Sequence, residues 1–174
     1  MIAYVLIALV TAQRLAELII ARRNTRALLA QGAYEVGSAH YPLIVAVHAA
    51  WLASLWILAP GRPILWPLIA VFVLLQCGRL WVLATLGRRW TTRIVVVPGE
   101  TLVRRGPYRF LNHPNYAVVV LEIATLPLVF GLWRTSLLFS LLNAAVLGIR
   151  IREENRALSA CRPRSVERSG RLAK

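Results

Sequence analysis

The sequence predicts an all-α integral membrane protein with about five transmembrane helices, the last two of which form a short helical hairpin. Hydrophobic residues make up 58% of the 174 residues, and the mean hydropathy is +0.61. This composition is too apolar for an ordinary soluble domain. Five separate apolar runs approach the length that a bilayer requires. We therefore expect one membrane domain over residues 1–158 and a basic tail over residues 159–174.

The apolar runs define the expected spans. The first run lacks the positive region and cleavage site of a signal peptide, so we expect it to be retained as a span. The fourth contains Pro127, and the fifth is short and follows a tight connection at residues 131–134. This last hairpin is therefore a candidate for a segment that does not cross the whole bilayer. In chain order, the expected spans are residues 2–21, 41–59, 64–86, 116–132 and 135–149.

The charges predict the orientation of the chain. The formal net charge is +14, and arginines gather after the first, third and fifth spans, whereas the opposite connections carry only Arg62 and Arg134. The positive-inside rule then places the N-terminus outside and the long loop and C-terminus in the cytoplasm of a cell-membrane protein. A basic chain can also indicate nucleic-acid binding, but here the apolar runs favour contact with membrane lipids and no nucleic acid. The two cysteines lie far apart and indicate no metal site.

Several polar residues fall inside the expected spans, all in the cytoplasmic half. Ionisable groups are costly in a membrane and are candidates for function. The set predicts a polar pocket that opens to the cytoplasm beneath the loop of residues 87–115. The alternative is that Arg14 and Glu17 pair within one helix and that Arg79 reaches the membrane surface along its aliphatic stem. The residues concerned are Arg14, Glu17, His48, Gln76, Arg79, Glu122 and Asn143.

Two polar stretches flank the expected hairpin. The first, GPYRFLNHPNY, begins with a turn at Gly106 and carries Pro114 near the start of the fourth span. A helix start of this kind suits anionic or polar ligand groups. The second, RIREENRAL, places Arg150 and Glu154 on one helix face, although a solvated helix end with salt bridges has the same spacing. A short β-branched run at residues 94–97 precedes both.

These stretches resemble the isoprenylcysteine carboxyl methyltransferase family of integral membrane enzymes. The family pattern is roughly G-P-Y-x-x-x-R-H-P-x-Y, a hairpin, and R-x-x-x-E-E-x-x-L, and the resemblance covers residues 86–158. The stretch EVGSAHYP is similar to one in bacterial members. Asn112 stands where the family usually has Arg, and Val118 where many members have Gly. The tail after Leu158 lacks the aromatic continuation of the prenylcysteine enzymes. The chain is more similar to a bacterial branch that methylates alkylpyrones and alkylresorcinols.

The resemblance implies methyl transfer from S-adenosylmethionine to an oxygen of a lipophilic acceptor that enters sideways from the bilayer. It also implies that the loop and the C-terminal helix cap a cofactor pocket. For the chemistry we assign Glu122, Arg150, Glu154 and His48. Either Glu122 or His48 is the candidate base for an enol or phenol, and His48 could instead pack at a helix interface. The candidate cofactor residues are Tyr108, Arg109, His113, Pro114, Asn115, Tyr116 and Glu154.

Three alternatives remain at this point. The first is a prenylcysteine carboxyl methyltransferase, and the second is an NADPH-dependent membrane reductase of the sterol reductase type, which carries a similar HPNY stretch. The third is a non-catalytic scaffold whose basic loop binds anionic lipid. The sequence does not identify the acceptor or the oligomeric state. It contains no Gly-rich loop of the soluble Rossmann type.

Overall fold

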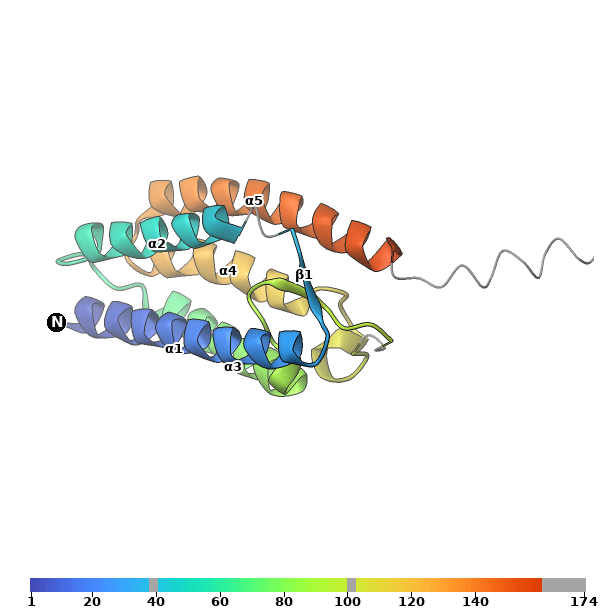
Figure 1. Ribbon diagram of the computed structural model, residues 1–174. Coiled ribbons are helices and arrows are strands. Elements are labelled where there is room, and N and C mark those ends of the chain that lie inside the picture. Colours follow the sequence, from blue (N-terminus) through green and yellow to red (C-terminus); the bar gives the residue numbers. More distant parts are fainter. Residues whose placement is uncertain (38–40, 100–102, 161–174) are drawn as a thin grey trace, which may run out of the picture.

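The computed structural model describes residues 1–37, 41–99 and 103–160, so the predicted tail from residue 161 onward lies outside the described residues (Figure 1). The described chain consists almost entirely of helices. The elements are, in order, α1 (Ile2–Ala30), β1 (Tyr34–Val36), α2 (Tyr41–Leu58), α3 (Trp66–Leu86), the 3-10 helix η2 (Gly87–Arg89), β2 (Ile94–Val96), the 3-10 helix η3 (Gly106–Arg109), α4 (Pro114–Val129) and α5 (Trp133–Ala160).

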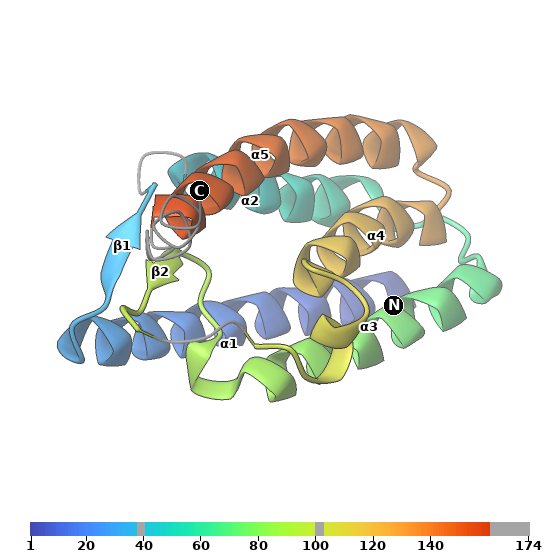
Figure 2. The same ribbon diagram turned by 90° about the vertical axis from the view of Figure 1, so that its right-hand side faces the viewer.

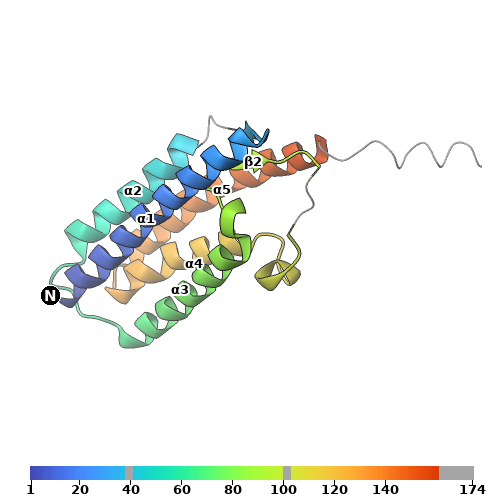
Figure 3. The same cartoon turned by 60° about the horizontal axis from the view of Figure 1, so that its bottom comes forward.

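The five long helices form a closed bundle. Around the bundle, α1 packs on α2, α2 on α5, α5 on α4, and α4 on α3 (Figures 2 and 3). Side chains of α1 and α3 complete the ring, because Glu17 bonds to Arg79 and Gln13 bonds to Gln76. The strands, η3 and the C-terminal end of α5 all lie at the end of the bundle opposite Met1 (Figure 1). We call this the loop end.

The predicted fold class is confirmed, and two helices continue past the predicted membrane spans. Helix α1 runs nine residues beyond Ala21, and α5 continues past residue 149 to Ala160, as the expected helical spacing of Arg150 and Glu154 requires. Both extensions contain good helix formers, so the helix continues after the apolar pattern has stopped. Within the described residues, four helices are long and apolar enough to cross a membrane, including the stretch Trp133–Glu154 of α5. Helix α4, with 16 residues, is about 24 Å long and falls short of a bilayer of about 30 Å.

A two-stranded ribbon joins two connections that are far apart in the sequence. Strand β1 pairs antiparallel with β2, with Glu35 opposite Val95 and Val36 opposite Ile94. The β-branched run at residues 94–97 therefore forms the expected extended segment, but its partner strand carries no comparable signal. The ribbon attaches the α1–α2 connection to the α3–α4 connection at the loop end (Figure 2).

The apolar core occupies the part of the bundle nearer Met1. Ile7, Trp51, Leu55, Ile123 and Phe130 are completely buried and belong to one continuous cluster from α1, α2, α4 and the α4–α5 turn. The charged residues predicted inside the spans lie toward the loop end from this cluster, whereas Asn143 lies between the core residues Phe139 and Val146. The bundle therefore changes from an apolar interior to a polar one along its length.

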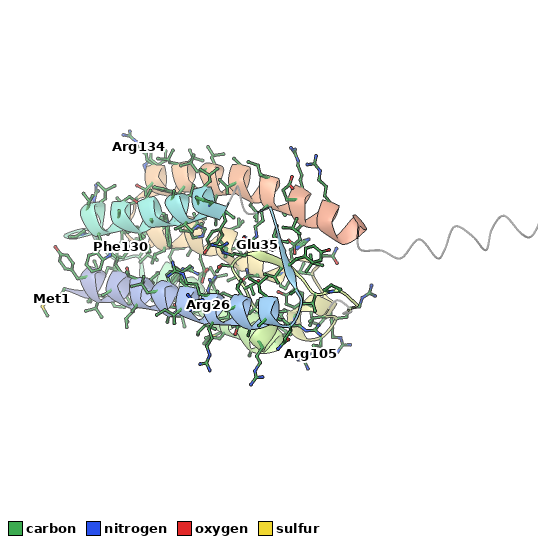
Figure 4. The ribbon with its side chains drawn as sticks, viewed as in Figure 1. Met1, Arg26, Glu35, Arg105, Phe130 and Arg134 are labelled. Atoms are coloured by element: carbon green, nitrogen blue, oxygen red, sulfur yellow. The ribbon has the colours of Figure 1, made fainter. Side chains whose placement is uncertain are left out.

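Charged residues are distributed unevenly between the two ends. Arg26, Glu35 and Arg105 lie toward the loop end, whereas Met1, Phe130 and Arg134 lie at the other end (Figure 4). A charge bias between the two ends of a helical bundle is typical of proteins that insert into membranes with one orientation.

Gly106 is required where η3 packs on the end of α3. It has φ +56°, and a Cβ at this position would lie 2.5 Å from Thr85 Oγ1. We expect Gly106→Ala to lower the thermal midpoint by more than Gly99→Ala. Gly99 also has a positive φ but has open space around it. The Gly99→Ala variant is therefore destabilised only by the strained backbone conformation, which costs about 1–2 kcal/mol. Thermal unfolding in detergent measures the difference, and equal shifts would show that η3 does not pack against Thr85 in solution.

Candidate functional site

The two sequence motifs meet at a cluster formed by Tyr116, Arg150 and Glu154. The Tyr116 hydroxyl donates to Glu154 Oε2 at 2.5 Å and accepts from Arg150 Nε at 2.8 Å. Tyr116 lies in the first turn of α4, and the other two lie one turn apart on α5, as their spacing predicts. A single hydroxyl thus connects a cation and an anion where α4 begins.

An aromatic stack forms one side of the cluster. The rings of His113 and Tyr116 are stacked, with centroids 5.1 Å apart and an angle of 12° between their planes. His113 Nδ1 lies 3.9 Å from Glu154 Oε2, and the Arg150 guanidinium lies 5.5 Å from the centre of the Tyr116 ring. Flat aromatic faces beside charged groups suit a ligand that has both a planar ring and charged ends.

Residues from the ribbon and α2 hold Arg150 in place. Arg150 Nη1 donates to the Thr92 carbonyl at 2.7 Å, and the Thr92 hydroxyl lies 3.1 Å from the Tyr41 hydroxyl at the start of α2. Arg93 pairs with both carboxylate oxygens of Glu35 at 2.8 Å and lies over the Tyr41 ring. Sequence reasoning missed these four supporting residues. Part of the signal was available, because EVGSAHYP contains Glu35 and Tyr41.

Pro114 and Asn115 lie beside the cluster. Pro114 is buried at the first position of α4, where its missing N–H is not needed. The Oδ1 atom of Asn115 is buried and has no hydrogen-bond partner in the described structure. An orphaned acceptor is costly unless a ligand satisfies it. Asn115 therefore suits a ligand that offers an N–H or O–H donor at this position.

Of the two candidate residues on η3, Tyr108 is affected by the charge of Glu154, whereas Arg109 is exposed. Burial, with a smaller contribution from the Glu154 carboxylate, raises the pKa of Tyr108 to about 12. Its phenol therefore stays protonated, and can donate a hydrogen bond, throughout the physiological pH range. Arg109, at the end of η3, is exposed, so the structure does not bring its side chain into the cluster.

Glu122 belongs to a second, interior network. Its Oε2 accepts from Arg14 Nη2 at 2.7 Å and from Arg79 Nη1 at 3.0 Å, and its Oε1 accepts from Gln76 at 2.8 Å. Arg79 also bonds to both carboxylate oxygens of Glu17. The two glutamates and two arginines neutralise one another within the bundle. We call these four residues and Gln76 the interior network.

The interior network corrects two predictions. The pocket open to the cytoplasm is wrong for these groups, because the side chains of Glu17, Arg79 and Glu122 are no more than 7% exposed. Arg79 does not reach the membrane surface, because it lies between two carboxylates. The pairing of Arg14 with Glu17 within α1 is present at 3.2 Å, as one part of the larger network. Glu122, with three donors already bound, is a poor proton acceptor.

His48 lies on α2 near the interior network. Its Nδ1 lies 2.8 Å from the carbonyl oxygen of Ile44, one turn earlier. Because a carbonyl can only accept, Nδ1 carries the proton, and the neutral ring has its lone pair on Nε2. His48 is thus separate from the Tyr116 cluster, although both were predicted for one site. In the described residues, no cluster of His, Cys or acidic side chains could hold a metal ion.

Comparison with known proteins agrees with the motifs. The model of the isoprenylcysteine carboxyl methyltransferase (ICMT) family matches residues 68–160, which include the whole Tyr116 cluster. A Bacillus subtilis (strain 168) protein described as uncharacterized protein YpbQ is 44% identical over 160 residues, covering 89% of this chain and 95% of the relative. An uncharacterized protein of Haemophilus influenzae (strain ATCC 51907 / DSM 11121 / KW20 / Rd) is 26% identical over 164 residues, covering 91% and 95%. No solved structure matches the chain significantly. The chain therefore belongs to the isoprenylcysteine carboxyl methyltransferase family of S-adenosylmethionine-dependent membrane methyltransferases.

Proposed function

We propose that this multi-pass membrane protein transfers a methyl group from S-adenosylmethionine to an oxygen of a lipophilic acceptor, of the long-chain alkylpyrone or alkylresorcinol type. The observation that carries the proposal is the meeting of Tyr116, Arg150 and Glu154 at the start of α4. The two motifs that supply these residues lie far apart in the sequence, and their meeting places a cation, an anion and an aromatic ring where one ligand can contact all three.

The residues of the cluster fit the functional groups of S-adenosylmethionine, which supplies the methyl group when bound. Within the described part of the chain, Glu154 Oε1 and Arg150 Nη2 have no hydrogen-bond partner. The carboxylate suits an ammonium group or ribose hydroxyls, and the guanidinium suits a carboxylate. The stack of His113 and Tyr116 suits an adenine ring, and Asn115 Oδ1 suits its amino group.

The protein contributes mainly the position of the reacting groups. Arg150 is fixed by Tyr116 and by the Thr92 carbonyl, so its free nitrogen points in a set direction. Fixed geometry of this kind supplies much of the rate of a displacement reaction, because the reacting atoms are held in line. An acceptor that arrives within the bilayer keeps its chain in lipid and brings only its head group to the site. The arginine bias supports a cytoplasmic location for this site and an external N-terminus in the cell membrane.

The direct test of this function is equilibrium binding of S-adenosylhomocysteine and NADPH to the purified protein in detergent. We expect S-adenosylhomocysteine to bind and NADPH not to bind. Label transfer from S-adenosylmethionine to alkylpyrone, alkylresorcinol and prenylcysteine acceptors then distinguishes the acceptor classes. Binding of NADPH without S-adenosylhomocysteine would overturn the proposal in favour of a reductase.

A matched pair of variants tests the role of Glu154. We expect Glu154→Gln to weaken S-adenosylhomocysteine binding roughly 10- to 100-fold, because hydrogen bonds to charged groups contribute about 1.5–3 kcal/mol. The control is Glu153→Gln, which removes the neighbouring carboxylate, paired with the exposed Arg156. It should bind like the wild type. Equal losses in both variants would mean that Glu154 acts only through the overall charge of α5.

A further inference from the structure

We infer that His48 and Asn143 form the binding site for the acceptor head group, with His48 as the proton acceptor, and that the acceptor carries a hydroxyl on a ring rather than a carboxylate. This inference rests on the proposed methyltransferase function. It adds the binding of the methyl acceptor and the removal of its proton, which the Tyr116 cluster does not provide.

Asn143 carries the first observation. It is 6% exposed, and its Nδ2 is buried without a hydrogen-bond partner in the described structure. Its neighbours on the same face of α5, Phe139 and Val146, belong to the apolar core. A buried amide without a partner destabilises a fold by about 1–3 kcal/mol. Such a residue inside a membrane bundle is a candidate for binding a polar group that is absent from the protein itself.

His48 lies at the same depth as Asn143. Tyr41 at the start of α2 and Arg150 on α5 both contact Thr92. His48 is seven residues along α2 from Tyr41, and Asn143 is seven residues along α5 from Arg150, both away from the loop end. At 1.5 Å per residue, each lies about 10 Å further into the bundle. Helices α2 and α5 pack on each other, so the two side chains occupy one level of the interior.

Of the two candidate bases, Glu122 and His48, it is His48 that is free to accept a proton. Glu122 is bound by Arg14, Arg79 and Gln76, so its carboxylate is occupied. His48 has its proton fixed on Nδ1 by the Ile44 carbonyl, which leaves Nε2 able to accept. Trp51, one turn further along α2, adds a completely buried indole N–H that has no partner among the described residues. This level and the next turn of α2 therefore contain two donors without a partner in the described structure, beside the acceptor nitrogen of His48.

This arrangement fits a hydroxyl next to another oxygen on a ring. The hydroxyl donates to His48 Nε2, and the second oxygen accepts from Asn143 Nδ2. As the hydroxyl oxygen bonds to the methyl carbon, the carbon–sulfur bond breaks, and the hydroxyl proton passes to His48. The products are the methyl ether, S-adenosylhomocysteine and an imidazolium, so charge is conserved. A carboxylate acceptor has no proton to lose and would leave His48 without a role.

The Asn143→Leu variant tests the binding half of this inference. Removal of an unsatisfied amide should leave the thermal midpoint equal to or above that of the wild type. We expect the KM for an alkylresorcinol to rise roughly three- to tenfold, the value of one hydrogen bond, with S-adenosylhomocysteine affinity unchanged. A loss of thermal stability with an unchanged KM would assign Asn143 a structural role and overturn the inference.

The His48→Gln variant tests the proton transfer. Glutamine can still donate to the Ile44 carbonyl but cannot accept the proton, so kcat with alkylresorcinol should fall roughly 100-fold or more. Ser54→Ala is the control, because in the described structure the Ser54 hydroxyl donates only to the Trp51 carbonyl of its own helix. If S-adenosylhomocysteine binds but only a prenylcysteine is methylated, and at equal rates in wild type and His48→Gln, the inference fails and the methyltransferase function stands. Absence of S-adenosylhomocysteine binding to the wild type overturns both.

Discussion

An Arg79→Met variant is expected to unfold roughly 10 °C below the wild type. Arg79 lies between Glu17 and Glu122 and is 4% exposed. Its removal leaves two buried carboxylates with Arg14 as their only guanidinium partner within the interior network. Breaking a buried ion pair in this way costs about 3–5 kcal/mol, because one charge stays uncompensated. Thermal unfolding in detergent measures the shift.

Two further variants establish that the loss comes from unpaired charge. Arg23→Met removes an exposed arginine of α1 and should unfold like the wild type. The double variant Arg79→Met/Glu17→Met removes one cation and one anion, which leaves Arg14 and Glu122 paired at 2.7 Å. It should recover much of the lost stability, because a well-packed apolar pair often replaces a buried ion pair without loss. A double variant less stable than Arg79→Met would contradict this account.

Tyr116→Phe is expected to lower kcat/KM for S-adenosylmethionine roughly 10- to 100-fold, equivalent to about 1.4–2.7 kcal/mol. Among the described residues, the hydroxyl is the one atom that bonds to both Arg150 and Glu154. Phenylalanine keeps the stack with His113 but releases both charged groups from their set directions. Steady-state kinetics with labelled S-adenosylmethionine and a lipid acceptor measure the effect.

The matched control for this change is Tyr4→Phe. Tyr4 is half exposed, its ring is tilted against that of Trp56 in α2, and it lies near the opposite end of the bundle. The Tyr4→Phe variant should leave both kcat/KM and the thermal midpoint unchanged. If Tyr116→Phe retains full activity, the hydroxyl does not organise the site, and Arg150 and Glu154 act independently of it.

The sequence predicts the parts of this site that lie close together along the chain. The spacing of Arg150 and Glu154, and the position of His113 and Tyr116 at a helix start, follow from helical geometry alone. The depth of the polar residues also follows, because hydropathy locates the spans. These local rules are sufficient to place the two halves of the candidate site at the same end of the bundle.

The parts of the structure that the sequence does not predict depend on contacts between segments that are far apart in the chain. Glu35 and Arg93 are separated by 58 residues, and neither has a local partner that indicates their pairing. The interior network illustrates the same limit, because the position of Glu122 predicts a functional role but not its saturation by two arginines. Hydropathy also gives no information on where α1 and α5 end, because a helix keeps its hydrogen bonds when its side chains become polar.

The ribbon of β1 and β2 also sets an order of assembly. During synthesis β1 emerges before α2, and β2 emerges only after α3. The strands can pair because α2 runs away from the loop end and α3 runs back toward it, which brings both strands to one end of the bundle (Figure 1). Thr92, which contacts Arg150, lies two residues before β2. Because the ribbon forms beside Thr92, the partner of Arg150 is in place once the α2–α3 hairpin has formed, before α5 is synthesised.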